Sequence, residues 1–292
     1  MEKTYKKISG IFRNPAVWQE LAMLNPETDH QRMVHLLTAY EFSYDFEKSL
    51  ELALFHTFGS PKVSALLDKT GEFKNHGQKR YDDTGTLIVR FMESGYSSEI
   101  GKRAIAQMNF IHGHYAIANE EYLFVLASFV FYPMRWIENY GWRQLTTPEK
   151  EALFLFFREV GKRMNLHYLP ETITDLEAFT TAYEEKNLVF AQSNRNIADA
   201  TLQVAENWFP SWLRFIVRPV ILVLLPEKLR KAFGYRKPNG LWYLLIEISL
   251  WLRKLVLRLF CFEAYPKLHF HGHNRTYPKH DYQIENLKPN NL

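Results

Sequence analysis

The sequence predicts an all-α protein, with a single multi-helix globular body and a basic, amphipathic C-terminal helical extension. Apolar residues recur with the 3.6-residue period of an α-helix along most of the chain, whereas the strict alternation typical of strands is scarce. The chain has 292 residues, of which 47% are hydrophobic and 15% are aromatic. A chain of this length buries roughly three quarters of its unfolded surface on folding, so a large apolar core is available.

Each expected helix is an amphipathic segment, and several begin or end at recognisable residues. Asn119-Glu120-Glu121 and Thr147-Pro148-Glu149 resemble helix starts, because acidic residues and proline favour the first turn. Gly59-Ser60-Pro61 and Gly95 mark helix ends. The apolar run 122–134 is too short to cross a bilayer comfortably and predicts a buried core helix. Helices are expected over residues 28–58, 61–69, 82–95, 97–115, 118–139, 147–164, 172–206, 209–225 and 239–262.

The chain contains no linker rich in Gly, Ser or Pro, no low-complexity tract and no internal repeat. We therefore expect one helical body over residues 1–207. Residues 208–292 form the extension, which packs on the body or on a membrane surface and ends in a polar tail. His269, His271 and His273 belong to that tail, and without a nearby carboxylate or cysteine they are more typical of a polar segment than of a metal site.

The single cysteine and the charged N-terminal residues exclude several types of site and argue against secretion. Cys261 is the only cysteine, which excludes disulfides within the chain, thiolate zinc sites, iron–sulfur clusters and covalent c-type haem. The charged start, Met1 to Lys7, lacks the apolar run of roughly 7 to 15 residues that a secretory signal requires. We therefore expect no signal peptide and a cytoplasmic location.

Positive charge is concentrated in the extension. Residues 208–262 carry ten Lys or Arg residues against Glu227 and Glu247, whereas the net charge of the whole chain is only +4. Basic residues near an anionic leaflet contribute about 1 kcal/mol each, so the last helix could bind peripherally to a membrane. The alternative is a helix that packs its apolar face on the protein's own core and leaves its basic face in solvent. Nucleic acid is not an expected partner, because the basic residues alternate with long Leu and Ile runs.

Three polar residues on apolar helix faces predict a buried polar site. Arg80 and Thr84 lie four residues apart on one helix face, and His112 lies on the apolar face of a later helix. An unpaired buried polar group costs about 2 to 7 kcal/mol, so these groups need a common ligand or one another. We interpret the ligand as haem. The two stripes are Arg80, Thr84, Leu87, Ile88 and Phe91, and Ile105, Met108, His112 and Tyr115.

His112 is the expected ligand of the haem iron, because it shares the apolar stripe and a neutral imidazole suits an axial position. His114 lies about 200° further round the helix and is the fallback if the helix unwinds at Gly113. Two plainer interpretations remain open. His112 could be a hydrogen-bonded core histidine, and Arg80 and Thr84 could lie in an ordinary solvated first turn of a helix.

At these residues the chain resembles the latex-clearing protein (rubber oxygenase) superfamily, which also includes the ER-bound oxygenase of mycophenolic acid biosynthesis. The similarity covers about residues 35–205. The matching segments are Lys79-Arg80-Tyr81-Asp82-Asp83-Thr84, Met108-Asn109-Phe110-Ile111-His112-Gly113-His114-Tyr115, Asn119-Glu120-Glu121-Tyr122, Pro133-Met134-Arg135-Trp136 and Phe157-Arg158-Glu159-Val160-Gly161-Lys162-Arg163-Met164.

This resemblance implies an all-α fold that binds b-type haem and cleaves an isoprenoid carbon–carbon double bond with dioxygen. Carried over to this chain, His112 would be the proximal ligand, Arg80 and Thr84 would line the pocket, and Arg135 would contact the cofactor. The chain departs from the family at Asp83, where rubber-cleaving members have a lysine, and this carboxylate joins Arg80 and Thr84 as a catalytic candidate. The departure argues against polyisoprene as the substrate. The distal glutamate is also missing from its usual spacing, and Glu72 lies closer to Arg80 in sequence.

We therefore expect a haem b-dependent oxygenase that acts with dioxygen on a hydrophobic, isoprenoid or lipid-like small molecule. The alternative is a non-catalytic protein, either helical and peripheral to a membrane or merely haem-binding. Rival chemistry has little support, because the chain lacks HExxH, GxSxG, a Walker-type glycine loop and the paired ExxH elements of a di-iron bundle.

Overall fold

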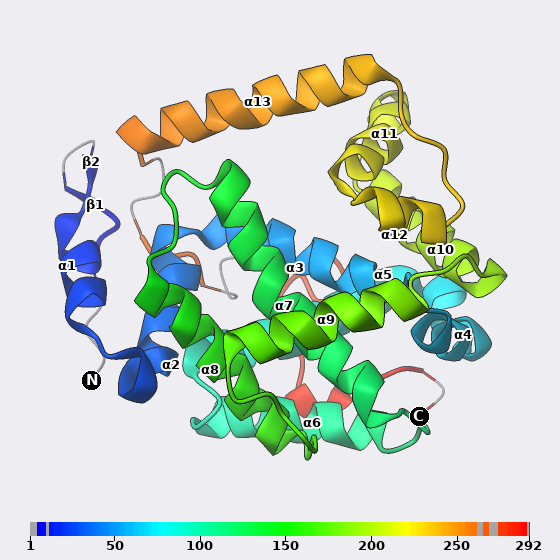
Figure 1. Ribbon diagram of the computed structural model, residues 1–292, viewed down its shortest axis with the longest axis horizontal. Coiled ribbons are helices and arrows are strands. Elements are labelled where there is room, and N and C mark those ends of the chain that lie inside the picture. The colour runs from blue at the N-terminus through cyan, green and yellow to red at the C-terminus, as the bar shows by residue number, and fades with distance from the viewer. Residues whose placement is uncertain (1–4, 10–11, 262–264, 269–273, 291) are drawn as a thin grey trace.

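Helices packed against helices make up the body of the protein, which confirms the all-α prediction (Figure 1). The structure is a computed structural model and describes residues 5–9, 12–261, 265–268, 274–290 and 292. His269, His271 and His273 lie outside the described residues, so the polar tail expected there stays a prediction.

A two-stranded antiparallel hairpin comes before the helices, with Ile8 opposite Arg13. Its strands are β1 (Ile8–Ser9) and β2 (Phe12–Arg13). The α-helices are α1 (Pro15–Met23), α2 (Pro26–Leu36), α3 (Ser43–Thr57), α4 (Pro61–Thr70), α5 (Glu72–Ser94), α6 (Glu99–His112), α7 (Asn119–Tyr140), α8 (Thr147–Arg163), α9 (Ile173–Asn187), α10 (Gln192–Asn207), α11 (Arg214–Leu224), α12 (Glu227–Ala232) and α13 (Gly240–Leu259). Shorter turns are the π-helical η1 (Leu37–Glu41) and the 3-10 turns η2 (Ser211–Leu213) and η4 (Ile284–Asn286).

Two helices that the sequence predicts as continuous are each divided in the structure. The segment 28–58 forms α2 and α3, which are separated by η1 and by Phe42, whose φ of −134° and ψ of 35° lie outside the helical region. The segment 172–206 forms α9 and α10, because residues 188–191 are not helical. Apolar side chains continue across both breaks, although Val189 and Phe190 at the second one are exposed, so periodicity alone does not reveal the breaks.

The helix expected over residues 82–95 begins earlier than predicted, at Glu72, and bends at His76, where φ is −136°. Arg80 therefore lies in the first turn after the bend, and Thr84 lies one turn further along the helix. The alternative of a first helical turn agrees with the place of Arg80, but both side chains are half-buried rather than exposed.

The core lies between α2, α3, α7 and α8, and α3 and α7 cross the middle of the body in Figure 1. Met33, Val130 and Leu153 are fully buried where these helices meet. The run 122–134 lies within α7 and is largely buried, as the sequence predicts. This packing fixes the helices that surround the candidate site.

The extension packs on the body rather than standing apart from it. α11 contacts α10, α13 contacts α11 and α7, and Ile284 and Leu287 belong to the main core. The boundary between residues 207 and 208 stays a prediction. α13 does not take the orientation that the sequence alternative assumes, because its charged side chains face the body and its apolar side chains face outward. The alternative with a solvated basic face is therefore wrong.

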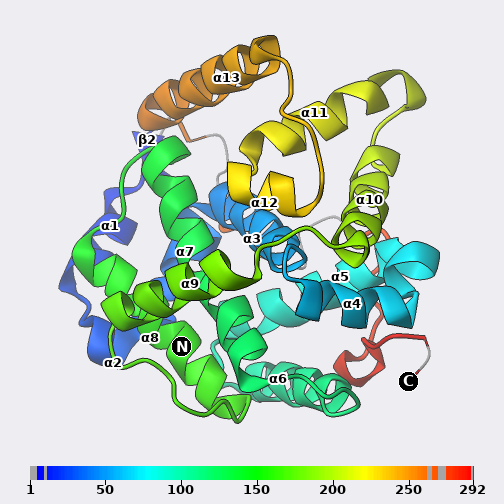
Figure 2. The same cartoon turned by 45° about the vertical axis from the view of Figure 1, so that its right-hand side comes forward.

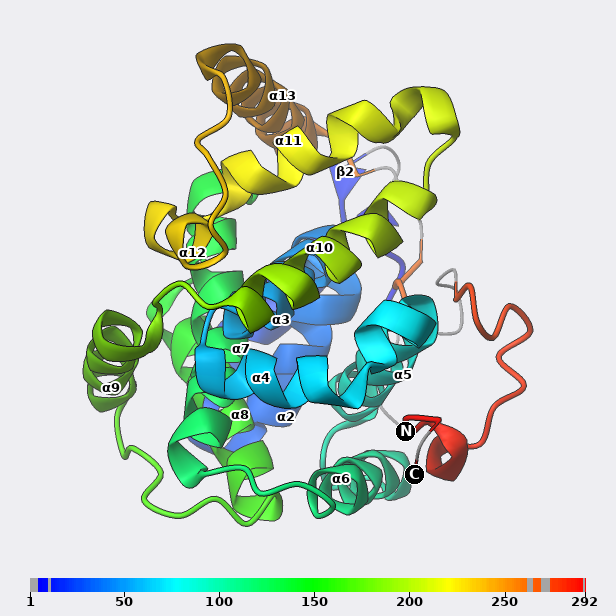
Figure 3. The same cartoon turned by 90° about the vertical axis from the view of Figure 1, so that its right-hand side faces the viewer.

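A tail of residues 274–290 crosses α5 and α6 on one side of the body (Figure 3). Its attachment is polar, because Tyr277 donates a hydrogen bond to Asp83 at 2.8 Å and Thr276 donates one to Asp82 at 2.5 Å. Lys79 binds both Asp83 and the carbonyl of Lys288, each at 2.6 Å. Burial raises the pKa of Asp83, and the bonds from Lys79 and Tyr277 act against that rise. Asp83 thus anchors the tail.

We predict that Tyr277→Phe weakens the attachment of the tail. Hydrogen bonds to charged groups contribute about 1.5–3 kcal/mol, so the free energy of unfolding should fall by about that amount. Urea unfolding measures the loss, and limited proteolysis should show faster cleavage within residues 274–290. Tyr265→Phe is the matched control, because Tyr265 is 62% exposed. Equal stability and proteolysis of the two variants would show that the Tyr277 bond does not hold the tail.

Candidate functional site

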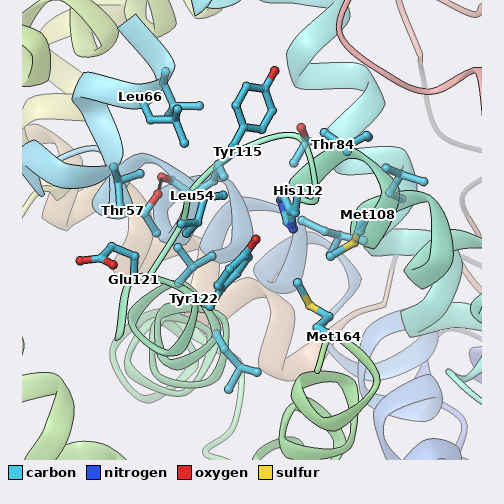
Figure 4. Close-up of a pocket in the computed structure, with 18 of the residues that line it drawn as sticks. Leu54, Thr57, Leu66, Thr84, Met108, His112, Tyr115, Glu121, Tyr122 and Met164 are labelled. Carbon is cyan, nitrogen blue, oxygen red and sulfur yellow. Dashed lines mark hydrogen bonds between the residues drawn. The ribbon is translucent and has the colours of Figure 1, made fainter. Parts of the chain in front are cut away.

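A cavity of about 550 Å³ lies between α3, α4, α5, α6, α7 and α8 (Figure 4). Its walls are mostly apolar, and a few polar side chains stand among them. The volume falls within the range of about 300–1,000 Å³ that is typical of cofactor and small-molecule sites. The polar side chains in its wall are Thr57, Lys62, Thr70, Glu72, Arg80, Thr84, His112, Tyr115, Glu121 and Tyr122.

The structure brings Arg80, Thr84 and His112 to this one cavity, as their helical spacing predicts. All the members of the α5 stripe line the cavity, and so do Met108 and His112 of α6. Tyr115 also lines it, although α6 ends at His112 rather than at residue 115 as predicted. Ile105 is the exception, because it is buried in the core. The two predicted faces therefore form two walls of one site.

Hydrogen bonds outside the cavity hold α6 and the loop after it. The side chain of Asn109 donates to the carbonyl of Arg163 at 2.8 Å, which ties α6 to the end of α8. Asn119 and His167 exchange two hydrogen bonds of 2.8 Å, which fix the start of α7. The backbone N–H of Tyr115 donates to the carbonyl of His112. The end of α6 that carries His112 is thus held on both sides.

The imidazole of His112 is neutral at neutral pH. Burial lowers its pKa to about 4, and the positive charge of Arg80 acts in the same direction. Its Nδ1 is buried and has no hydrogen-bond partner among the described residues. The ring packs edge-on against Tyr122, with 5.3 Å between ring centroids. In Figure 4 the ring stands between Thr84 on one side and Tyr122 and Met164 on the other. Most buried polar atoms in proteins have a hydrogen-bond partner, so an unbonded Nδ1 is unusual for a histidine that serves only the core.

The guanidinium of Arg80 lines the cavity and makes no hydrogen bond or ion pair with any residue that the structure describes. Burial lowers its pKa, and the nearby carboxylate of Asp83 opposes that shift. Its nearest aromatic neighbour is Phe73, whose ring centroid lies 5.9 Å away. Arg80 is half-buried in an otherwise apolar wall, and a cation without an ion pair there suits an anionic group of a ligand.

A charged cluster lies where the cavity meets the surface. Lys62 of α4 contacts both Glu120 and Glu121 of α7, and its Nζ lies 3.1 Å from Glu121 Oε1. Lys62, Ala116 and Ala118 line the cavity and are also exposed. This rim between α4 and the loop after α6 is therefore polar, whereas the interior is apolar.

Three other predicted site residues do not reach the cavity. His114 is exposed, and its Nδ1 bonds the carbonyl of Phe110 at 2.8 Å. Asp83 is fully buried but faces the tail. Arg135 lies on the outer face of α7, where its side chain is 48% exposed and lies 3.9 Å from Glu177. Helical spacing had already placed His114 away from His112, and although α6 ends at His112, His114 does not turn into the cavity. The spacing gave no indication of the directions of Asp83 and Arg135.

The sequence analysis missed several residues of the cavity wall, among them Lys62, Glu121 and Pro289. Glu121 could have been found, because it continues the stripe of Val125 and Phe129 at four-residue spacing toward the start of α7. No sequence pattern predicts that Pro289 lines the cavity, because its position depends on how the tail packs against the body.

We predict that the unfolding free energy of the ligand-free protein depends on His112 between about pH 6.5 and 4. Below pH 6.5 the unfolded imidazole takes up a proton, whereas the folded one resists protonation until its pKa of about 4. Stability should therefore fall with falling pH in this window by at most about 1.4 kcal/mol per pH unit. Urea unfolding of His112→Gln should show a smaller slope, and His114→Gln should keep the slope of the unchanged protein. Identical slopes for all three proteins would contradict a neutral buried His112.

The family model and the similar proteins that this chain matches all belong to one family of oxygenases. Residues 52–253 match the family model described as the ER-bound oxygenase mpaB/B'/rubber oxygenase catalytic domain. The ER-bound oxygenase mpaB' of Penicillium brevicompactum is 31% identical over 236 residues, which cover 75% of this chain and 56% of that protein. The ER-bound oxygenase mpaB of the same organism is 29% identical over 237 residues, with 75% and 54% covered.

The ER-bound oxygenase mpaB of Penicillium roqueforti (strain FM164) is 29% identical over 217 residues, which cover 67% of this chain and 72% of that protein. The chain spans about half the length of the two P. brevicompactum proteins that it matches. The family model spans most of the chain and includes the helices that form the cavity. The chain therefore belongs to the family of ER-bound oxygenase mpaB/B'/rubber oxygenase catalytic domains.

Proposed function

We propose that this protein is a haem b-dependent oxygenase that uses dioxygen on a hydrophobic, isoprenoid or lipid-like small molecule. The observation that carries this proposal is the apolar cavity in which a neutral His112 and an unpaired Arg80 stand together. The relatives are named oxygenases, which supports the reaction class. Oxidative cleavage of a carbon–carbon double bond is the reaction that the family resemblance suggests.

The residues of the cavity fit a b-type haem. The buried imidazole of His112 has an unbonded nitrogen and a lowered pKa, and a histidine binds iron through its neutral, unprotonated imidazole. The cation of Arg80 lacks an anionic partner, which a haem carboxylate would supply. When bound, the haem would supply the iron at which dioxygen is activated. His112 would hold the metal and Arg80 the edge of the ring.

The other wall residues would bind and shield the substrate. Met108, Val125, Phe129 and Phe157 give the interior an apolar surface, which favours a hydrophobic chain and excludes water. The hydroxyls of Thr84 and Tyr115 would orient an oxygen atom of the substrate by hydrogen bonding. Asp83 and Arg135, which the sequence analysis included among the site residues, would act outside the cavity if they act at all.

Attachment to a membrane is part of the proposal. The named relatives are described as ER-bound, and a hydrophobic substrate is concentrated in lipid. Among the described residues, no helix combines the length and the apolar character needed to cross a bilayer. We therefore propose peripheral binding at a membrane, with the cytoplasmic location expected from the sequence.

We predict that His112→Ala abolishes haem binding. After expression with a haem precursor, the unchanged protein should purify with a Soret absorption band, because the imidazole supplies the axial bond. His112→Ala should lose that band, and His114→Ala should keep it, since His114 is exposed and bonded to Phe110. An unchanged protein without the band would favour the non-catalytic alternative. A His112→Ala protein with an unaltered band would refute the ligand assignment.

We also predict that Arg80→Gln weakens haem binding by about 10- to 100-fold, which corresponds to the loss of a charge-assisted hydrogen bond of about 1.5–3 kcal/mol. Titration of haem into the ligand-free protein measures this change. Arg135→Gln is the matched control, because Arg135 lies on the outer face of α7. If Arg135→Gln loosened haem while Arg80→Gln did not, the contact with the cofactor would belong to Arg135.

A further inference from the structure

Helix α13 turns its charged side chains toward the protein. Arg253 forms two hydrogen bonds to the carboxylate of Asp45, at 2.9 and 3.1 Å, and Asp45 is only 2% exposed. The next residue, Lys254, donates to the carbonyl of Asn139 at 3.1 Å, and Arg258, one turn on, donates to the carbonyl of Trp142 at 3.2 Å. Leaving the buried carboxylate of Asp45 without Arg253 would be strongly destabilising, so these bonds fix the rotation of the helix about its axis.

The opposite face of α13 is apolar and uncovered by the described residues. Ile246 is the one residue of this helix that is buried. The outer face repeats with helical period, and its side chains remain between 44% and 61% exposed. They include Leu241, Leu244, Ile248, Trp251, Leu255 and Leu259. A helix that binds its charges inward and leaves its leucines outward requires a nonpolar environment outside.

A neighbouring segment extends this surface. α11 contacts α13, and Trp212 of η2 and Phe215 at the start of α11 are 70% and 69% exposed. Figures 1 and 2 show α11 and α13 along the same side of the molecule, while α6, which forms part of the cavity wall, lies on the other side. The exposed residues of α13, together with Trp212 and Phe215, are called the apolar face below.

The charge around the apolar face distinguishes among its possible occupants. Arg214, Arg236 and Lys237 are exposed near it, whereas Glu247 is an isolated acidic residue on α13. Arg218, Lys231 and Arg253 of this segment already pair with carboxylates. The exposed Arg214, Arg236 and Lys237 have no ion pair among the described residues, so a second copy of this chain would bring like charge to the contact. An anionic lipid surface supplies the opposite charge and the nonpolar layer together.

We infer that the protein docks on an anionic bilayer through the apolar face, with α13 lying in the plane of the membrane. Its leucines and Trp251 then enter the boundary between headgroups and acyl chains, and the surrounding cations contact lipid headgroups. This inference deepens the membrane attachment proposed above by assigning its surface. This inference does not depend on haem. Absence of the Soret band would count against the proposed cofactor alone, and absence of vesicle binding would count against the docking surface alone.

The orientation has a consequence for the cavity. The rim at Lys62 belongs to α4 and the loop after α6, whereas the docking face belongs to α11 and α13. A protein docked in this way keeps the charged rim in water. The apolar face is therefore an anchor rather than the entrance for the substrate.

Flotation of the whole chain with vesicles tests the inference. Vesicles of phosphatidylcholine with phosphatidylserine should bind the protein, and binding should weaken at high salt or with phosphatidylcholine alone. The triple variant Leu244→Gln, Ile248→Gln, Leu255→Gln should bind about tenfold more weakly or worse, because it removes apolar surface from the docking face. Trp emission should shift to the blue when the unchanged protein binds and should shift less in the variant.

The control variant is Met23→Gln, Tyr168→Gln, Val189→Gln, which alters residues at least 51% exposed on other surfaces. It should bind vesicles as the unchanged protein does, and circular dichroism should show that both variants are folded. The inference is overturned if the unchanged protein ignores anionic vesicles at low salt, or if both variants bind equally. It is also overturned if sedimentation shows a dimer that only the α13 variant dissociates, because a second copy would then cover the apolar face.

Discussion

The arrangement of the site depends on α5, which has two buried faces of different chemistry. One face turns Arg80 and Thr84 toward the cavity. The next residues round the helix, Asp82 and Asp83, are buried on the other side and must find donors there. Those donors come from Lys79 and from the tail, so that the same helix shapes the cavity and fixes the segment that closes part of it.

Much of this could be predicted from the sequence, because a helical period places side chains on faces. Arg80 and Thr84 share a face with Phe91, and Met108 shares one with His112; in both cases the structure shows a wall of the cavity. The period also identifies the core helix α7. It cannot show the break at Phe42, because apolar residues remain inward on both sides of the π-helical turn.

The remaining features depend on contacts between distant segments. Asp83 looked like a site residue because it precedes Thr84, yet its direction is set by Tyr277, far along the chain. Arg135 lies in a motif of the family but on the outward face of its helix. The orientation of α13 follows from the bond between Arg253 and Asp45, which are 208 residues apart. The local sequence pattern shows which residues share a helix face. It does not show which of these faces packs against a segment that is distant in the sequence.

The path of the tail has a consequence for biosynthesis. Pro289 forms part of the cavity wall, and the backbone N–H of Asn290 donates to Glu72 at the start of α5. During translation, the six helices around the cavity emerge long before these positions do. A nascent chain therefore holds a pocket with an incomplete wall until the tail has left the ribosome and packed against α5.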